Sequence, residues 1–315
     1  MPLLYHPVSV SFYVVISYNS RQSIFGGTPV KIILSRKGFD ASAGKAASPI
    51  FPSGELCSLP IPEPVPSGHA KRYEEIRIGC QSLGTIVNDL TEGKVKPDSL
   101  AHLDPDLNMA SIPRLANWRP VFGQAGAAER HLLNHGVKEG DVFVFYGWFR
   151  QVEQVAGRYR YVKSAADMHV IFGWLQIERR IPVDHLSEIP AWALDHPHCK
   201  KTRYSSIDSI YISTDRMSLP NVIINKSGAG VFQKFDPALR LTAQNMSRSI
   251  WRLPGWFYPI ENKPGLSYHR SLRRWKLEED YVLLNSVGRG QEFVLDCQDY
   301  PEAIDWLTSI LCLSS

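Results

Sequence analysis

Charged and hydroxyl side chains follow a short apolar segment near the beginning of the chain. Residues 30–34 read VKIIL, which predicts a buried strand, and SRKGFD follows within the same run. The guanidinium of Arg36 can donate two hydrogen bonds to a phosphate, Lys37 adds a positive charge, and Gly38 leaves backbone amides accessible. Asp40 lies just past the strand end, and we predict it as a catalytic residue. A solvated turn is the alternative. The predicted phosphate-binding residues are Ser35, Arg36, Lys37 and Gly38.

The segment HLDPDL, residues 102–107, carries one imidazole and two carboxylates at alternate positions. In extended backbone, His102, Asp104 and Asp106 would point to the same side, because side chains alternate with a period of two. Such a group suits a divalent metal ion or an acid–base pair. We predict all three as catalytic residues and as ligands of a divalent metal. An ordinary turn is the alternative, since Asp-Pro-Asp is common turn chemistry.

Two further segments could complete such a centre. DHPHC, residues 195–199, carries His196 and His198 on either side of a proline. Two imidazoles can ligate a metal or supply a base. GQEFVLD places Glu292 next to a glycine and a glutamine, where a carboxylate can approach a cleft. We predict His198 and Glu292 as catalytic residues, against the alternatives of a plain His-Pro loop and a surface glutamate.

The segment GQAGAAERHLLNHG, residues 123–136, predicts a helix with small residues at its beginning. Backbone amides at a helix N-terminus form an anion site, and Gln124 there could read the edge of a base. His131 and His135 have the spacing of a zinc-binding helix. Leu132, however, stands where a metalloprotease of that type needs its glutamate, which argues against this kind of site and favours a role for His135 at the helix C-terminus.

Two aromatic segments predict the strands that would position these groups. Residues 140–153 and 168–178 each contain an aromatic-Gly-Trp-apolar sequence, with Gly147 and Gly173 at the matching position. A glycine in a strand permits a bend or a close backbone approach. We predict that the two segments are neighbouring strands of an antiparallel sheet or barrel.

The order of the predicted elements indicates the fold class and the domain organisation. Strands outnumber helices and no regular βαβ alternation is present, so we predict an α+β fold. Its sheet would be mainly antiparallel, with a PUA-like barrel as one form, and a few helices would flank it. Residues 1–30 are interpreted as an N-terminal extension, either disordered or an edge strand. Residues 31–315 are interpreted as a single domain.

Composition restricts the class of protein. The chain has 315 residues, of which 44% are hydrophobic and 21% charged, and this is typical of a globular protein. The net charge of +4 permits an anionic partner without requiring one. The five cysteines are dispersed, which argues against a disulfide framework and favours a cytoplasmic location. Because uninterrupted apolar stretches are short, we expect no association with a membrane.

Taken together, these segments resemble the nucleotide modification associated domain 3 family. The resemblance is carried by IILSRKGFDASAG, HLDPDL, GQAGAAERHLLNHGVKEGDVFVFYGWF, HVIFGWLQIE, HPH and GQEFVLD, and it extends from about Lys31 to the C-terminus. It implies an association with systems that modify nucleic-acid bases. It also adds His131 and Gln291 to the nucleotide-binding residues, which otherwise include Gln124. The possible cofactor is a divalent metal ion, and the implied partners are a nucleotide or nucleic acid, DNA in preference to RNA, and proteins of a modification system.

The middle of the chain has a second, looser similarity, to the strand pattern of PUA-like and EVE-like domains. The segments GDVFVFYGW and VIFGWLQIE carry it. The similarity implies that the aromatic strands form the wall of a base pocket.

These observations predict a protein that acts on a nucleotide or a nucleic-acid base through a carboxylate and histidine centre. A non-catalytic reader of modified nucleic acid, with a PUA-like base pocket, is the alternative, and a scaffold subunit is a third. Clustering of Asp40, Asp104 and His198 would favour the enzyme. An aromatic pocket between the strands of Gly147 and Gly173, with those acids dispersed, would favour the reader.

Overall fold

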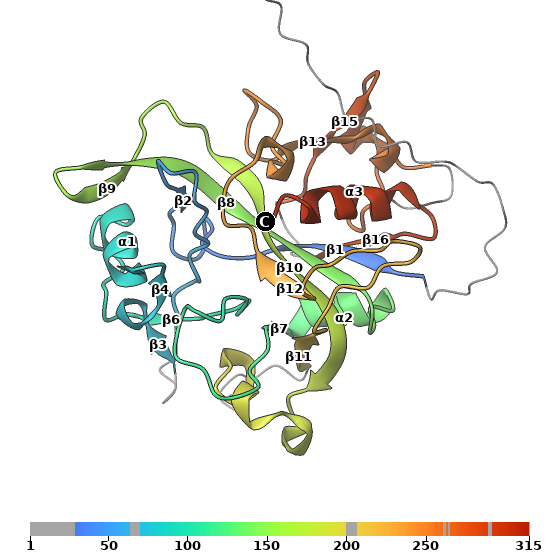
Figure 1. Ribbon diagram of the computed structural model, residues 1–315. Helices are drawn as coiled ribbons and strands as arrows, with labels where there is room; N and C mark the ends of the chain where they lie inside the picture. Colours follow the sequence, from blue (N-terminus) through green and yellow to red (C-terminus); the bar gives the residue numbers. More distant parts are fainter. Residues whose placement is uncertain are drawn as a thin grey trace, which may run out of the picture.

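The computed structural model describes residues 29–63, 70–199, 207–260, 263, 265–288 and 292–314. A nine-stranded sheet forms its centre, and six of the strands lie in the order β16-β1-β8-β10-β11-β7 (Figure 1). Their bounds are β1 Lys31–Arg36, β7 Val121–Ala125, β8 Val142–Val155, β10 Met168–Pro182, β11 Asp208–Ser213 and β16 Glu292–Asp296. Three short strands pair with β8 or β10, namely β2 Ser48–Ile50, β9 Arg158–Tyr161 and β12 Ala229–Val231.

The two aromatic strands lie in the middle of this sheet, as the sequence predicts. β8 and β10 are antiparallel neighbours, with Gly147 opposite Val170 and Gly173 opposite Phe145. The first ten residues of β10 are all buried, and so are most of the first eight of β8. Large side chains on both faces of these strands therefore pack into the core, which is typical of central strands covered on both sides.

The sheet is mixed, because β1 and β2 run parallel to β8 while the other pairs are antiparallel. This arrangement confirms the predicted α+β class and the largely antiparallel sheet. The strand order of the described residues has two ends, at β16 and β7, so these residues form no closed barrel. The PUA-like barrel is therefore corrected to an open sheet.

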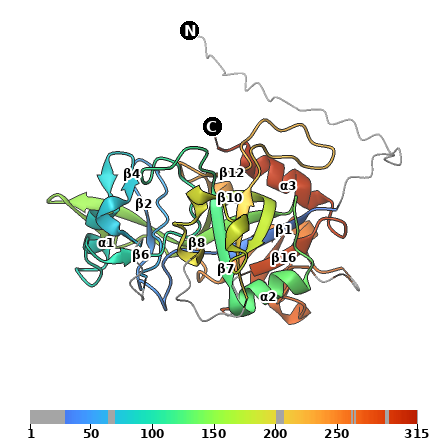
Figure 2. The ribbon, with the colours of Figure 1, turned by 90° about the horizontal axis from the view of Figure 1, so that it is seen from below.

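Three smaller sheets and three α-helices complete the described part of the chain. The small sheets contain β13 Ile250–Pro254, β14 Trp275–Leu277 and β15 Tyr281–Asn285; β3 Lys71–Arg72 and β6 Leu100–Ala101; and β4 Arg77–Ile78 and β5 Gln81–Ser82. The helices are α1 Leu83–Leu90, α2 Gly126–Asn134 and α3 Glu302–Leu311. Helices α2 and α3 lie on either side of β1 and β16, while α1 lies at the far end of the molecule (Figures 1 and 2).

Short 3-10 helices interrupt several of the connections. They are η1 Tyr73–Glu75, η2 Leu186–Glu188, η3 Ala191–Ala193, η4 Pro197–Cys199, η5 Pro237–Leu239, η6 Gly255–Phe257 and η7 Leu272–Arg274.

Helix α1 shows how the local sequence determines these elements. Ser82 caps its N-terminus, because the side-chain oxygen accepts a hydrogen bond from the backbone amide of Gly84. Leu83, Ile86 and Leu90 recur at helical spacing and are buried against the segment of Tyr73.

The predicted helix over residues 123–136 is corrected at its beginning. Residues 121–125 form β7, and the helix α2 starts at Gly126. The reason is tertiary, since Phe122 pairs with Tyr211 of β11 and the two rings stack at 5.8 Å between centroids. Gln124 therefore lies in a strand and not at a helix N-terminus.

Two other expectations from the sequence concern a membrane and the N-terminal extension. None of their helices is long and apolar enough to cross a membrane. Of the proposed N-terminal extension, residues 1–28 lie outside the described residues.

Candidate metal and polar site

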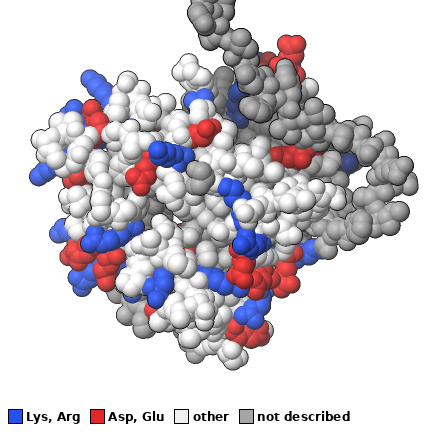
Figure 3. Space-filling model, in the orientation of Figure 1, with Lys and Arg blue, Asp and Glu red and all other residues white. Residues whose placement is uncertain are grey.

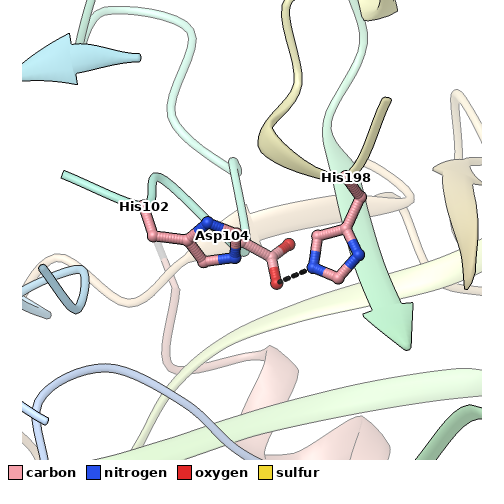
Figure 4. A group of neighbouring side chains, drawn as sticks. All are labelled: His102, Asp104 and His198. Atoms are coloured by element: carbon pink, nitrogen blue, oxygen red, sulfur yellow. Dashed lines mark ion pairs between the residues drawn. The ribbon is translucent and has the colours of Figure 1, made fainter. Parts of the chain in front are cut away.

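Three of the predicted residues come together inside the protein. His102 and Asp104 follow the short strand β6, and His198 lies in η4, far along the chain. One potential ligand atom from each residue lies within 4.8 Å of the other two, and the three residues are 4 to 8% exposed. Figure 4 shows the carboxylate of Asp104 between the two imidazole rings. We call His102, Asp104 and His198 the donor cluster.

Each imidazole of the donor cluster is held by a second carboxylate. His198 donates from Nδ1 to Oδ1 of Asp208 at 2.6 Å, and its Nε2 lies 3.7 Å from Oδ2 of Asp104. Nδ1 of His102 lies 2.8 Å from Oε2 of Glu63. A metal-ligating histidine usually donates its other ring N–H to a carboxylate or carbonyl in this way, which fixes the ring and increases its basicity.

The carboxylate of Asp104 receives several further interactions. The backbone amide of Gly123 donates to its Oδ1 at 2.7 Å, and Nε2 of His196 lies 3.3 Å from the same oxygen. Burial acts to raise the pKa of Asp104. The imidazoles of His196 and His198 and the ammonium of Lys37 more than offset that effect, so the pKa lies well below its usual value. Asp104 is therefore ionised at neutral pH, as a metal ligand must be.

Gly123 allows the ring of His198 to lie against β7. A Cβ atom at this position would be 2.3 Å from both Cγ and Cδ2 of His198. The glycine is therefore required for space, and it also supplies the amide that binds Asp104. Because Gly123 lies against the ring of His198 and donates to Asp104, β7 is in direct contact with the donor cluster.

A second buried polar group lies nearby, and we call it the Lys37–Glu292 cluster. Nζ of Lys37 is 3.1 Å from Oε1 of Glu292 and lies 4.4 Å from the centroid of the Phe122 ring. Ser35 and Gln124 donate hydrogen bonds to the same oxygen of Glu292. The sequence predicted Ser35, Lys37 and Gln124 as nucleotide-binding residues and Glu292 as catalytic. The fold brings them together from β1, the residue that follows it, β7 and β16.

The Lys37–Glu292 cluster is buried inside the protein. Glu292 is 1% exposed, and the side chain of Lys37 is 9% exposed. Oε2 of Glu292 is buried and receives no hydrogen bond from the described residues. The charge of Lys37 reaches Asp104 and lowers its pKa, so the two clusters are electrostatically connected.

Arg36 and Asp40 lie apart from both clusters, although Lys37 is between them in sequence. Arg36 donates to the carbonyl of Gly288 at 3.1 Å. Asp40 binds its own turn, since its Oδ1 accepts from the backbone amides of Ser42 and Ala43 at 2.7 Å. Asp40 therefore has a local capping role in the structure and is not part of the donor cluster.

Asp106 also lies outside the donor cluster. Both of its carboxylate oxygens accept from Arg114, at 2.6 and 2.5 Å, and its backbone pairs with Val121. The chain is not extended here, because the amide of Asp104 bonds to the carbonyl of His102 at 2.8 Å. The period-two alternation that would have aligned all three side chains therefore does not hold.

The remaining predicted nucleotide-binding residues are dispersed. Nε2 of His131 lies 2.9 Å from Oγ of Ser267, and its ring stacks on Tyr268 with 4.3 Å between centroids. Burial and the neighbouring His135 lower the pKa of His131 to about 4. Gln291 lies outside the described residues.

A cavity of about 100 Å³ adjoins the donor cluster at Asp104. Gly38, Leu107, Phe172 and Phe232 are among its lining residues. On the face of the molecule in Figure 3, Lys and Arg side chains are interspersed with Asp and Glu, and no broad basic surface covers this face.

The comparisons with known proteins agree with the resemblance seen in the sequence. The sequence profile of the nucleotide modification associated domain 3 family matches residues 31–296. No curated protein and no solved structure matches the chain. The protein therefore belongs to the nucleotide modification associated domain 3 family and has a role in a nucleotide modification system.

Proposed function

We propose that this family member is a metal-dependent enzyme that modifies a nucleotide or a nucleic-acid base. His102, Asp104 and His198 would hold the divalent metal ion. The observation that supports this proposal is the convergence of three buried donor side chains, two of which are imidazoles hydrogen-bonded to carboxylates. Such second carboxylates are expected behind metal-binding histidines.

The types of donor indicate the class of metal. Imidazole nitrogen suits iron, zinc and other transition-metal ions, whereas Mg²⁺ and Ca²⁺ prefer sites made of oxygen ligands. Two histidines and one carboxylate form a set found at catalytic sites, because three protein ligands leave positions for water or substrate. We therefore propose a transition-metal ion at the donor cluster.

The metal would act as a Lewis acid, or as the means of activating a bound water or oxidant. The surrounding residues have separate roles. Asp208 and Glu63 hold the two imidazoles in place, and the backbone amide of Gly123 orients the carboxylate of Asp104. Lys37 contributes a buried positive charge that stabilises anionic groups at the centre.

The geometry gives less support to the non-catalytic reader. A base pocket between the strands of Gly147 and Gly173 would require space beside them. Those strands are directly hydrogen-bonded, and a Cβ on Gly147 would be 2.7 Å from the carbonyl oxygen of Lys37. Of the three residues whose clustering would favour the enzyme, Asp104 and His198 lie together, whereas Asp40 lies apart; it is this pair, with His102, that supports the enzyme.

Metal analysis of the purified full-length protein tests the proposal. We expect the wild type to retain a transition-metal ion, and Asp104→Asn and His198→Gln to lose it, because each removes one donor. Asp299→Asn and His185→Gln are matched controls at partly exposed or exposed side chains. Equal metal content in all five proteins would contradict the proposed centre.

The catalytic part of the proposal needs a second measurement. Metal-loaded protein is incubated with DNA and with RNA oligonucleotides of the same sequence, and the nucleosides are then analysed by mass spectrometry. We expect a mass change that requires the metal and is absent with Asp104→Asn. Binding of an oligonucleotide without any change in either nucleic acid would favour the reader.

A further inference from the structure

Arg36 and Arg248 lie on the same face of the central sheet. Arg36 is the partner of Tyr146 in the register of β1 and β8, and Trp148 lies two residues further along β8. Residues two apart on a strand point to the same face and are separated by about 7 Å. The guanidinium of Arg248 lies 4.2 Å from the centroid of the Trp148 ring. The two cations therefore occupy neighbouring positions on this face.

The face that carries these arginines is opposite to that of the Lys37–Glu292 cluster. The side chains of Ser35 and Lys37 both contact Glu292, and Arg36 lies between them in the sequence, so it points to the other side of β1. Nη2 of Arg36 donates to the carbonyl of Gly288. The adjacent cations Arg36 and Lys37, which the sequence assigns to one phosphate site, therefore serve different faces.

Neither arginine is neutralised within the part of the chain that the structure describes. Both side chains are half-buried, and neither Arg36 nor Arg248 forms an ion pair with a described carboxylate. Nε of Arg36 is buried and makes no hydrogen bond to the described residues. A buried polar group without a partner costs free energy, and the cost is larger for a charged group. A bound anion would supply the missing acceptor and the missing charge.

Two carboxylates that act on this pair are already engaged. Oδ1 of Asp40 accepts from two backbone amides of its own turn, and Oδ1 of Asp167 accepts from an indole N–H at 2.8 Å. Burial and the charge of Arg36 lower the pKa of Arg248 more than these two carboxylates raise it. Burial and both arginines also lower the pKa of His169. The surroundings of the pair are therefore electropositive.

We propose that Arg36 and Arg248 form a binding site for a phosphate group. A guanidinium can donate two parallel hydrogen bonds to phosphate oxygens, and stacking on Trp148 holds that of Arg248 in place. The role of the family in nucleotide modification makes the backbone of a nucleic acid the expected source of the phosphate. The inference does not rest on the proposed metal centre, because the site shares no residue with the donor cluster.

Calorimetric titration of the full-length protein at low ionic strength tests this inference. The two probes are inorganic phosphate and a short single-stranded DNA of mixed sequence. We expect both to bind the wild type, and Arg36→Gln and Arg248→Gln each to weaken binding about tenfold or more, because each removes charge-assisted hydrogen bonds. If the variants weaken the binding of inorganic phosphate and leave that of DNA unchanged, the site is supported and free phosphate is its ligand.

Arg252→Gln is the matched control for these variants. Its guanidinium also stacks on a ring, at 4.3 Å from the centroid of Tyr281, but its side chain is exposed. We expect it to leave phosphate binding unchanged. Arg248→Lys retains the charge without the paired donors, so it should retain part of the binding. Loss of one phosphate contact should also reduce the slope of log K against log salt by about 0.7 for single-stranded DNA, which a purely structural arginine would not do.

Thermal unfolding and metal content separate this inference from the proposed function. Phosphate should raise the unfolding temperature of the wild type and not that of Arg36→Gln or Arg248→Gln, because only a bound ligand stabilises the native state. A wild type that binds neither probe, or folded glutamine variants that bind both probes as the wild type does, would overturn the inference whether or not the protein holds a metal. Loss of metal in Asp104→Asn, with phosphate binding intact, would show that the two sites are independent and support both.

Discussion

The donor cluster and the Lys37–Glu292 cluster are both buried and polar, but they differ in how charge is balanced. The carboxylate of Glu292 faces an ammonium group at 3.1 Å, so this cluster contains its own cation. The carboxylate of Asp104 faces imidazoles, and each imidazole of the donor cluster has a further carboxylate behind it. In the donor cluster, the atoms that converge are imidazole nitrogens and a carboxylate oxygen, which carry lone pairs. The comparison therefore distinguishes an ion pair that is complete in itself from the site that we propose for a metal cation.

The largest effect is expected from Lys37→Met. It leaves the buried carboxyl group of Glu292 without its cation, and breaking a buried pair costs about 3–5 kcal/mol of unfolding free energy. Urea unfolding measures this loss. Lys263→Met is the control, because its pair with Asp299 is partly exposed and should contribute less than about 1 kcal/mol.

The double variant Lys37→Met/Glu292→Gln removes both charges and should regain much of the stability lost by the single variant. Should Lys37→Met alone be as stable as the wild type, the ion pair would have no structural role and the comparison would fail.

Gly123→Ala should affect the donor cluster and not the ion pair. The added methyl group would overlap the ring of His198, and overpacking of this kind typically costs about 1–3 kcal/mol. We also expect a loss of bound metal, because the ring must move away from Asp104. Equilibrium dialysis against the metal measures it.

Gly255→Ala provides the matched control for this substitution. The nearest atom to its added Cβ would be 3.6 Å away, which is ordinary contact. A Gly123→Ala protein with unchanged metal affinity would show that His198 is not a ligand in the position described.

Asp208→Asn tests the second carboxylate behind His198. The amide can still contact Nδ1, but it lacks the charge that increases the basicity of the ring. Substitution of such partners typically lowers metal affinity about 10- to 100-fold. Competition with a chromogenic chelator measures this change, and Asp184→Asn, at an exposed position, is the control. An unaltered affinity would assign Asp208 a purely structural role.

The last effect is gradual, because it accumulates per pH unit, and it concerns a histidine that belongs to neither cluster. Nδ1 of His169 accepts a hydrogen bond from Nε1 of Trp251 at 3.0 Å. Burial, together with the charges of Arg248 and Arg36, lowers the pKa of His169 to about 3 from 6.5. The unfolded chain therefore takes up a proton that the folded protein does not.

Stability should consequently fall as the pH decreases below about 6.5, and His169 should contribute about 1.4 kcal/mol per pH unit to the slope. Urea unfolding between neutral and acidic pH measures it. His169→Gln should reduce the slope by one proton, whereas the exposed His185→Gln should leave it unchanged. Equal slopes in the wild type and His169→Gln would mean that His169 is protonated in the folded protein.

The residues of the donor cluster could be predicted from the sequence, because imidazoles and carboxylates at short spacing are an uncommon pattern. His102, Asp104 and His198 were predicted because imidazoles and carboxylates recur at short spacing around prolines. The reasoning failed for Asp106, since alternation holds only in extended backbone and residues 102–104 form a turn. It did not anticipate that Asp40 lies apart from the cluster, because a carboxylate after a strand can equally well cap its own turn.

The carboxylates behind the imidazoles were missed. Glu63 lies in the proline-rich segment PIPEPVP and Asp208 begins the strand DSIYIS, and neither has a spacing that relates it to His102 or His198. A weak signal was present, since Asp208 is the one carboxylate in an otherwise apolar and hydroxyl-bearing strand. The beginning of α2 was misplaced for a comparable reason, because only the pairing of β7 with β11 makes residues 121–125 a strand.

The donor cluster also has a mechanical consequence for the protein as a whole. Its ligands come from chain segments on either side of β7, β8 and β10 in the sequence, so a bound ion would act as a reversible cross-link between them. A ligand that binds only the native state stabilises it by mass action, by about 2.7 kcal/mol at a hundredfold excess over its dissociation constant. Chelation would then loosen the junction of these segments, and limited proteolysis would detect the loss as new cleavage sites.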